Sequence, residues 1–256
     1  MTLTDALGIK DREVISLAGG GGKTAIMFAL GKELSSRLKG VVLSTTTKIW
    51  EPAISPDFAL FLSGQISEIK KWVSRSLEAH PCLLVATKRL EGGKLQGIPP
   101  AWVEEIQSLP GVSVIIVEAD GAAGRSLKAP REGEPVWPPN TTLLVPVVGI
   151  DVLGRPLNEG HVFRSEIAAR VLHRSKGSTI TNEMVAGLLR EIIKDRPGGA
   201  RMIPFINKTD LPGGLEKGRK LAKVLLSLCQ VEIERVILGQ AQRSPAVQEV
   251  VWPSSG

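Results

Sequence analysis

Four consecutive glycines and the two residues after them form the segment of this sequence best suited to bind phosphate groups. A backbone without side chains can curl so that its N–H groups face phosphate oxygens. The lysine would reach the β- and γ-phosphates of a nucleotide, and the threonine hydroxyl would ligate Mg²⁺. Leu17 stands where the usual signature has its first glycine, and the alternative is a flexible glycine linker. The segment is Gly19, Gly20, Gly21, Gly22, Lys23 and Thr24.

Two carboxylates follow an apolar segment at 112–117. In a phosphate-binding α/β fold, the neighbouring strand brings an acid to the metal side of the phosphates. Glu118 would hold Mg²⁺ or its water, and the Gly121 N–H would approach the γ-phosphate. Asp120 competes with Glu118 for the metal, and one of the two would orient the attacking water. The alternative is a helix cap or a solvated charge.

The tetrapeptide Asn-Lys-Thr-Asp follows a third apolar segment and indicates guanine recognition. The Asp210 carboxylate would accept hydrogen bonds from N1 and the exocyclic amino group of guanine, which adenine does not offer in that arrangement. Asn207 would brace the loop, and Lys208 would lie along the base. The sequence therefore predicts a GTP-binding site.

Two further polar segments have two interpretations each. Thr45, Thr46 and Thr47 follow the second apolar segment, where a hydroxyl could complete Mg²⁺ coordination or bond the γ-phosphate. Local hydrogen bonding to the backbone is an equal alternative. Arg125 and Lys128 could neutralise charge during phosphoryl transfer, although a basic loop is usually solvated.

The elements that must position these residues alternate along the chain. Short apolar segments without polar alternation are typical of strands covered on both faces, as in a parallel sheet. We expect an α/β fold with a doubly wound, mostly parallel sheet of the P-loop NTPase type, in one nucleotide-binding domain at 1–256 with a helical insertion at about 149–199. The expected strands lie at 14–17, 41–43, 58–62, 82–86, 112–117, 143–148, 202–206 and 231–238, and the expected helices at 24–38, 66–79, 101–109, 165–174, 181–194 and 215–229.

Composition excludes several classes of protein. The chain has 256 residues, 43% of them hydrophobic, which is enough to build a core and excludes a disordered protein. We find no secretory signal and no segment of about 18 apolar residues, so we expect a cytoplasmic protein without a membrane partner. Cys82 and Cys229 are far apart and are interpreted as buried apolar residues. The net charge of +6 and the lack of an interleaved basic and aromatic motif argue against nucleic acid.

The order of these motifs resembles the YqeC-type accessory proteins of selenium-dependent molybdenum hydroxylases. Besides the segments above, the resemblance includes His161 with Arg164, the Lys-Ala-Pro segment at 128–130 and the segment at 147–154. It implies a role in maturing a selenium-containing molybdenum cofactor or delivering it to a client hydroxylase. More distantly, the chain is similar to metallocentre-assembly GTPases, but it lacks their Cys/His ligands, so we do not expect it to bind a transition metal.

Three functions stay open. The first is a Mg²⁺-dependent GTPase that acts as an assembly factor, with Lys23, Glu118 and Asp120 as its catalytic residues. The second is a small-molecule kinase or nucleotidyltransferase, in which the proline-rich loop at 121–140 and the insertion hold an acceptor. The third is a nucleotide-gated binding module without hydrolysis. The sequence does not fix the oligomeric state, and a homodimer is compatible with such a fold.

Overall fold

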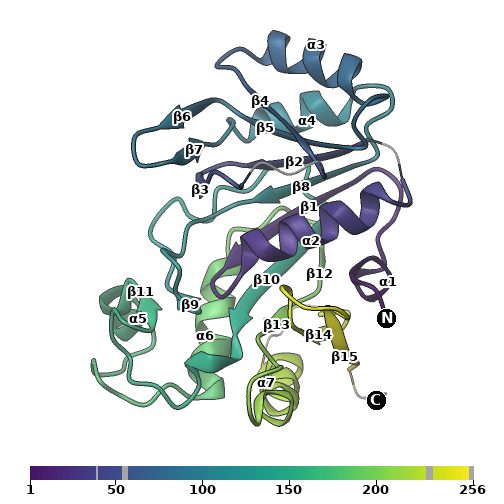
Figure 1. The fold of residues 1–256 in the computed structure, drawn as a ribbon. Helices are drawn as coiled ribbons and strands as arrows, with labels where there is room; N and C mark the ends of the chain where they lie inside the picture. Colours follow the sequence, from purple (N-terminus) through teal and green to yellow (C-terminus); the bar gives the residue numbers. More distant parts are fainter. Residues whose placement is uncertain (39, 54–56, 229–232, 254–256) are drawn as a thin grey trace.

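The largest feature of the protein is a ten-stranded sheet, seen in a computed structural model that describes all residues except 39, 54–56, 229–232 and 254–256 (Figure 1). Its strand order is β15-β14-β13-β10-β1-β8-β2-β5-β4, with β12 also paired to β10. Every pair is parallel except β14 with β15. Its strands are β1 (Glu13–Gly19), β2 (Val41–Thr45), β4 (Ala59–Leu62), β5 (Cys82–Ala86), β8 (Val114–Glu118), β10 (Leu143–Gly149), β12 (Arg201–Met202), β13 (Phe205–Asn207), β14 (Val236–Gly239) and β15 (Val247–Val251).

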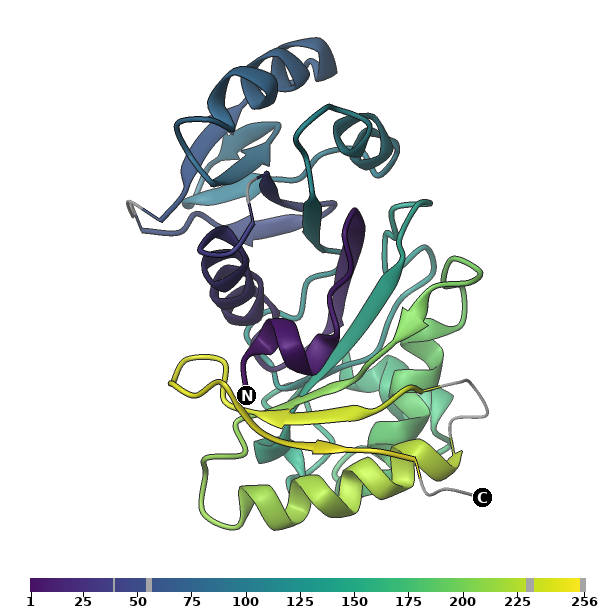
Figure 2. The same ribbon diagram turned by 90° about the vertical axis from the view of Figure 1, so that its right-hand side faces the viewer.

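Helices cover both faces of this sheet, which explains the continuous apolar character of its strands (Figure 2). Successive side chains of a strand point to opposite faces, so Ile15 and Leu17 pack on the side of α1 and α2, while Val14 packs on the side of α3 and α4. Helices α6 and α7 cover the other half of that second face. The helical elements are α1 (Leu3–Leu7), α2 (Lys23–Ser35), α3 (Ile66–Ser76), α4 (Ala101–Gln107), η1 (Ile150–Val152), α5 (Ser165–Val171), α6 (Asn182–Ile193) and α7 (Gly214–Leu228).

Two small sheets stand apart from the central one. Strands β9 (Leu127–Lys128) and β11 (Val162–Phe163) pair in parallel. Strands β3 (Lys48–Trp50), β6 (Lys88–Leu90) and β7 (Lys94–Gln96) form an antiparallel sheet in the order β3-β7-β6. Neither sheet is predicted from the sequence, because strands of two or three residues are too short to show a pattern.

The predicted fold class is confirmed: the protein is a mixed α/β protein with a large, mostly parallel central sheet flanked by helices, consistent with a P-loop NTPase-like fold. The strand expected at 231–238 falls partly outside the described residues, and β14 begins only at Val236. Helices α5 and α6 lie between β10 and β12, in the region predicted as an insertion. Among the described residues, no helix is long and apolar enough to cross a membrane.

The two cysteines differ in what the structure describes of them. Cys82 is a buried free thiol on β5, and burial raises its pKa to about 12, so it stays protonated. This agrees with its interpretation as a buried apolar residue. Cys229 lies outside the described residues.

Candidate functional site

The predicted site residues meet at the carboxyl ends of neighbouring parallel strands. Strand β1 lies between β8 and β10, and β10 also pairs with β13. The glycine loop follows β1, Glu118 ends β8, and Asn207 ends β13. Because these strands run in the same direction, their ends share one edge of the sheet, where open α/β sheets bind ligands.

The backbone of the glycine loop is held by hydrogen bonds inside the protein. The Gly19 N–H donates to the Asp120 carboxylate at 3.0 and 3.1 Å. The N–H groups of Gly20 and Gly21 donate to the Val147 and Arg125 carbonyls, each at 2.9 Å. The expectation that these glycine N–H groups face a phosphate is therefore wrong for the first three.

The loop needs glycine because other backbone segments lie against it. A Cβ atom on Gly20 would lie 2.6 Å from the Arg125 carbonyl oxygen, and Gly21 has a φ of +81°. The segment from Arg125 to Leu127 therefore packs directly against the glycine loop, and no side chain fits between this segment and the loop. Sequence patterns do not reveal this contact, since the two segments are about a hundred residues apart.

The phosphate-binding donors that the structure offers lie at the start of α2. The N-cap residue of this helix is Gly22, which has no side chain that could cap the helix. The first N–H groups of a helix have no partner within the helix, so those of Lys23, Thr24 and Ala25 are open to a ligand. The positive end of the helix dipole adds to the attraction for an anion.

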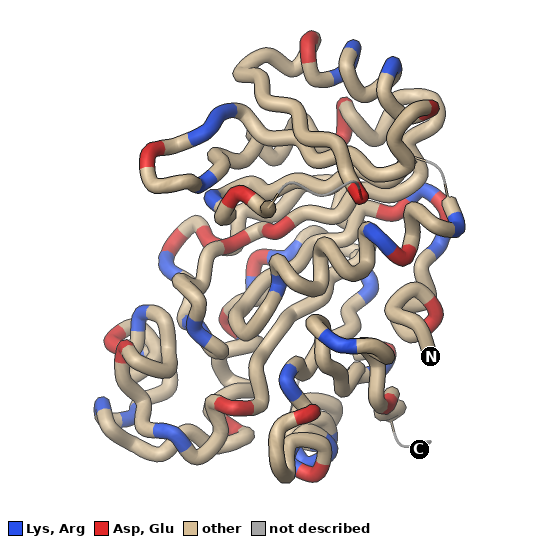
Figure 3. The backbone as a smooth tube through the Cα atoms, in the orientation of Figure 1, with Lys and Arg blue, Asp and Glu red and all other residues tan. Residues whose placement is uncertain are grey.

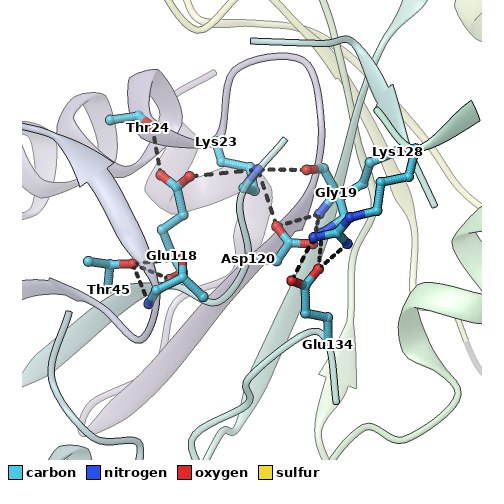
Figure 4. Close-up of polar contacts among 10 residues, drawn as sticks. Gly19, Lys23, Thr24, Thr45, Glu118, Asp120, Lys128 and Glu134 are labelled. Atoms are coloured by element: carbon cyan, nitrogen blue, oxygen red, sulfur yellow. Dashed lines mark hydrogen bonds and ion pairs between the residues drawn. The ribbon is translucent and has the colours of Figure 1, made fainter. Parts of the chain in front are cut away.

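Lys23 and Thr24 converge on Glu118 at this helix end (Figure 4). The Thr24 hydroxyl donates to Glu118 Oε2 at 2.6 Å, and Lys23 Nζ lies 3.6 Å from Glu118 Oε1. Lys23 Nζ also donates to the Gly19 carbonyl at 2.6 Å and lies 3.2 Å from Asp120 Oδ1. Both Lys23 and Glu118 are almost fully buried.

A row of charged side chains continues from the buried Asp120 and Lys128 to the partly buried Glu134 and Arg164, and we name these four residues the charge ladder. Lys128 Nζ lies 3.1 Å from Asp120 and 2.8 Å from Glu134. Arg164 donates to both oxygens of Glu134, at 2.6 and 2.9 Å. Lys128 is fully buried, so its interpretation as a solvated loop residue is wrong.

Burial and charge pairing oppose each other at the two residues nearest the loop. Burial alone would lower the pKa of Lys23, but Asp120 and Glu118 outweigh it and raise that pKa, so Lys23 is a cation at neutral pH. Burial raises the pKa of Glu118, and contact with Lys23 and Thr24 offsets only part of that rise. A cation bound beside Glu118 would favour its ionised form.

The Glu134 carboxyl is expected to make the stability of the fold depend on pH. Burial would raise its pKa, but hydrogen bonds from Arg164 and Lys128 lower it from 4.5 to about 2. A carboxyl with a lowered pKa stabilises the fold above its unfolded pKa, and this contribution is lost as the pH falls toward its folded pKa. We expect the stability advantage of the wild type over Glu134→Gln to shrink between about pH 5 and about pH 2. Urea unfolding curves for both proteins across that range measure it, and an unchanged difference would contradict the assignment.

Two of the residues predicted to recognise guanine, Asn207 and Lys208, make hydrogen bonds within the protein. The Asn207 side chain donates to the Gly21 carbonyl at 2.7 Å and accepts from the Ala241 N–H at 2.9 Å, so it braces the glycine loop as expected. Lys208 Nζ contacts Ser126 and Asp151, each at 2.8 Å.

Asn207 also contacts the loop after β14 through the Ala241 N–H, and Asp210 lies near this loop. The Asp210 carboxylate is 3.1 Å from Arg243, whose side chain is 69% exposed. An ion pair this exposed is weak, so a ligand can replace the guanidinium. Arg243 and Ala241 are site residues that the sequence analysis missed, because no motif marks the loop after β14.

One cavity of about 1150 Å³ joins these groups. It extends from the start of α2 to Asn207, Lys208 and Asp210 on one side, and to Trp50 and Arg164 on the other. Glu118 lines the cavity, whereas Asp120 is fully buried behind it. The structure therefore brings both predicted nucleotide motifs to one space.

The threonines and Arg125 are divided between backbone contacts and the cavity. The hydroxyls of Thr45 and Thr46 donate to the Glu118 and Val136 carbonyls, each at 2.7 Å, so they bond backbone of distant segments and not the local backbone offered as an alternative. Thr47 lines the cavity, and its N–H donates to the Thr45 hydroxyl. Arg125 also lines the cavity and donates to the Glu159 carbonyl at 2.7 Å.

The oxygen donors beside the loop fit Mg²⁺ better than a transition metal. Mg²⁺ is usually held by one or two protein oxygens, with phosphates and waters completing six ligands. Two such oxygens are Thr24 Oγ1 and Glu118 Oε2, which lie 2.6 Å apart. Within the described part of the chain, no group of three or more His, Cys, Asp or Glu side chains is arranged to hold a metal.

Comparison with known proteins supplies the family. A sequence model described as "YqeC protein" matches residues 15–166, more than half of the chain, and this span includes the glycine loop, Glu118, Asp120 and Arg164. A protein of Escherichia coli (strain K12) described as "Uncharacterized protein YqeC" is 28% identical over 251 residues, which cover 94% of this chain and 93% of that protein. The chain therefore belongs to the YqeC family.

Proposed function

We propose that this protein binds GTP with Mg²⁺ and hydrolyses it, and that it acts as an accessory factor for a client enzyme. The observation that supports this most is the shared cavity, in which the helix after the glycine loop and the Asn-Lys-Thr-Asp segment face one space. A phosphate site and a base site in one cavity match the two ends of a nucleotide.

In this proposal each residue has a defined task. The N–H groups at the start of α2 hold the phosphates, and Lys23 compensates the charge of the β- and γ-phosphates. Thr24 and Glu118 would hold Mg²⁺, which when bound neutralises charge on the transferring phosphoryl group. Asp120 fixes Lys23 and the Gly19 N–H, so it is a positioning residue in this scheme.

The resemblance in sequence motifs suggests the biological setting. We propose that nucleotide binding and hydrolysis control the maturation of a selenium-containing molybdenum cofactor or its delivery to a hydroxylase. Co-purification of a molybdenum hydroxylase with the protein in the presence of GTP, and its loss with GDP, would support this setting. Equal recovery with both nucleotides would contradict nucleotide control.

Changing Asp210 to asparagine tests the base assignment. We expect GTP affinity to fall about 100-fold, since two hydrogen bonds to a charged acceptor are lost or weakened. Xanthosine triphosphate should bind better to this variant than to the wild type, because its 2-oxo group accepts a hydrogen bond from the asparagine amide. Calorimetric titration of both nucleotides measures the exchange.

The matched control is Asp195→Asn, an exposed position after α6 that does not line the cavity. It should leave both affinities unchanged. If Asp210→Asn bound GTP as tightly as the wild type, guanine recognition by Asp210 would be refuted.

A second candidate function is phosphoryl or nucleotidyl transfer to a small acceptor. The cavity favours it, because the proline-rich loop and Arg164 line the cavity beyond the phosphate end. Turnover that depends on an acceptor and is much faster than hydrolysis would select this function. Tight GTP binding without phosphate release would instead select a nucleotide-gated binding module.

A further inference from the structure

Part of the cavity is not used by the proposed nucleotide contacts. Beyond the start of α2 the cavity continues between the β3-β7-β6 sheet and the loop before β10. We name this part the distal subsite, lined by Lys48, Trp50, Lys94, Gln96, Arg131 and Arg164. Small-molecule sites have volumes of roughly 300–1000 Å³, so a cavity of about 1150 Å³ has room for a second ligand beside a nucleotide.

One face of the small sheet is built to line this subsite. Strand residues alternate between faces, and the central residues Ile49 and Leu95 are buried in the core on the α2 side. The residues before and after them form the cross-strand pairs Lys48 with Gln96 and Trp50 with Lys94. All four of these residues line the cavity, so the sheet is anchored by one face and presents the other to a ligand.

Trp50 is the aromatic group of the subsite. It is 65% exposed, which is unusual for the largest apolar side chain. Lys94 Nζ lies over its ring, 4.7 Å from the centre, so the ammonium group covers part of one face of an otherwise exposed aromatic ring. A flat ring can stack on tryptophan while an attached anion contacts the ammonium group.

The charges around the subsite favour an anion. Apart from Lys23 and Glu118 at the phosphate end and Lys208, Asp210 and Arg243 at the base end, the described cavity wall has five cationic side chains and two carboxylates. Figure 3 shows Lys and Arg on both strands of the β6–β7 hairpin, with acidic chain at its tip. Arg131 and Arg164 both pair with Glu134, so one carboxylate is shared by two guanidinium groups and by Lys128. The cationic side chains are Lys48, Lys94, Arg125, Arg131 and Arg164, and the carboxylates are Glu132 and Glu134.

We propose that the distal subsite binds a second small molecule, an anion that contains a flat aromatic ring, beside the nucleotide. Trp50 stacks on the ring, and Lys94, Arg131 and Arg164 contact the anionic group. The inference rests on the proposed function only for the position of the first ligand. It gives the acceptor or regulator of this site a chemical class.

The probe for this subsite is 2-naphthyl phosphate, titrated against the full chain alone and against the chain saturated with Mg²⁺ and a non-hydrolysable GTP analogue. We expect a dissociation constant of about 1 mM or below in the loaded protein. Cyclohexyl phosphate, which lacks the aromatic ring, and 2-naphthol, which lacks the charge, should both bind more weakly. The affinity of the GTP analogue is measured separately.

Two variants and one control locate the binding. Trp50→Ala should weaken the probe about tenfold, and Lys94→Ala severalfold, without changing affinity for the GTP analogue. The control is Trp252→Ala, which removes another exposed tryptophan that lies outside the cavity and has the Arg235 guanidinium carbon 4.9 Å from the centre of its ring. It should change nothing.

The outcomes separate this proposal from the nucleotide proposal. If the loaded wild type does not bind the probe, or if Trp50→Ala and Lys94→Ala bind it as tightly as the wild type, the distal subsite is refuted. If the GTP analogue does not bind, the proposed function fails, and the same variants titrated without nucleotide still decide the subsite.

Discussion

Replacement of Lys128 by methionine is expected to lower the free energy of unfolding by about 3–5 kcal/mol, the cost of breaking a buried ion pair. Lys128 is fully buried between Asp120 and Glu134. Without it, Asp120 keeps its contact with Lys23, but Lys23 also pairs with the buried carboxylate of Glu118. Chemical denaturation of the two proteins measures the difference.

Arg131→Met is the matched control for this variant. Arg131 contacts the same Glu134 at 2.9 Å, but its side chain is 66% exposed, so its loss should cost less than about 1 kcal/mol. Adding Asp120→Asn to Lys128→Met removes the surplus negative charge, and we expect it to recover part of the stability. If Lys128→Met lowered the free energy of unfolding as little as Arg131→Met, the charge ladder would not stabilise the fold.

Lys23→Met is expected to weaken GTP binding by about 100-fold or more, because charge-assisted hydrogen bonds to the β- and γ-phosphates disappear. Lys23 also takes part in the buried charges, so a general loss of structure must be told apart from a lost contact. GMP provides that comparison, since it lacks both phosphates. Calorimetric titration should show GMP affinity close to that of the wild type.

Lys32→Met is the control on the same helix, with a side chain that is 69% exposed and paired to Asp57. It should leave GTP binding unchanged. A parallel fall of GTP and GMP affinity in Lys23→Met would point to a damaged fold, and unchanged GTP affinity would refute the role of the glycine loop.

Local patterns predicted the parts of this protein that depend on neighbours in sequence. Apolar segments such as the one at 82–86 predicted the central strands, because burial on both faces requires an unbroken apolar run. The glycine loop was predicted between strand and helix, and its position between β1 and α2 agrees. Asn207 was expected to brace the loop and does so through the Gly21 carbonyl.

Contacts between distant segments could not be predicted in the same way. The carbonyl of Arg125 lies beneath Gly20, and nothing in either segment signals the other. Lys128 resembled a solvated loop residue, because its contacts with Asp120 and Glu134 depend on how an irregular loop folds, which no periodic pattern marks. Trp50 lines the cavity because it ends the strand β3, and a strand of three residues is too short to show a periodic pattern.

The binding of GTP and ATP to the wild-type protein, measured by calorimetric titration with and without Mg²⁺, tests the central claim most directly. We predict one GTP per chain, tighter binding with Mg²⁺, and affinity for ATP at least about 100-fold lower. Binding of neither nucleotide, or equal binding of both, would contradict a guanine nucleotide site formed by the glycine loop and Asp210.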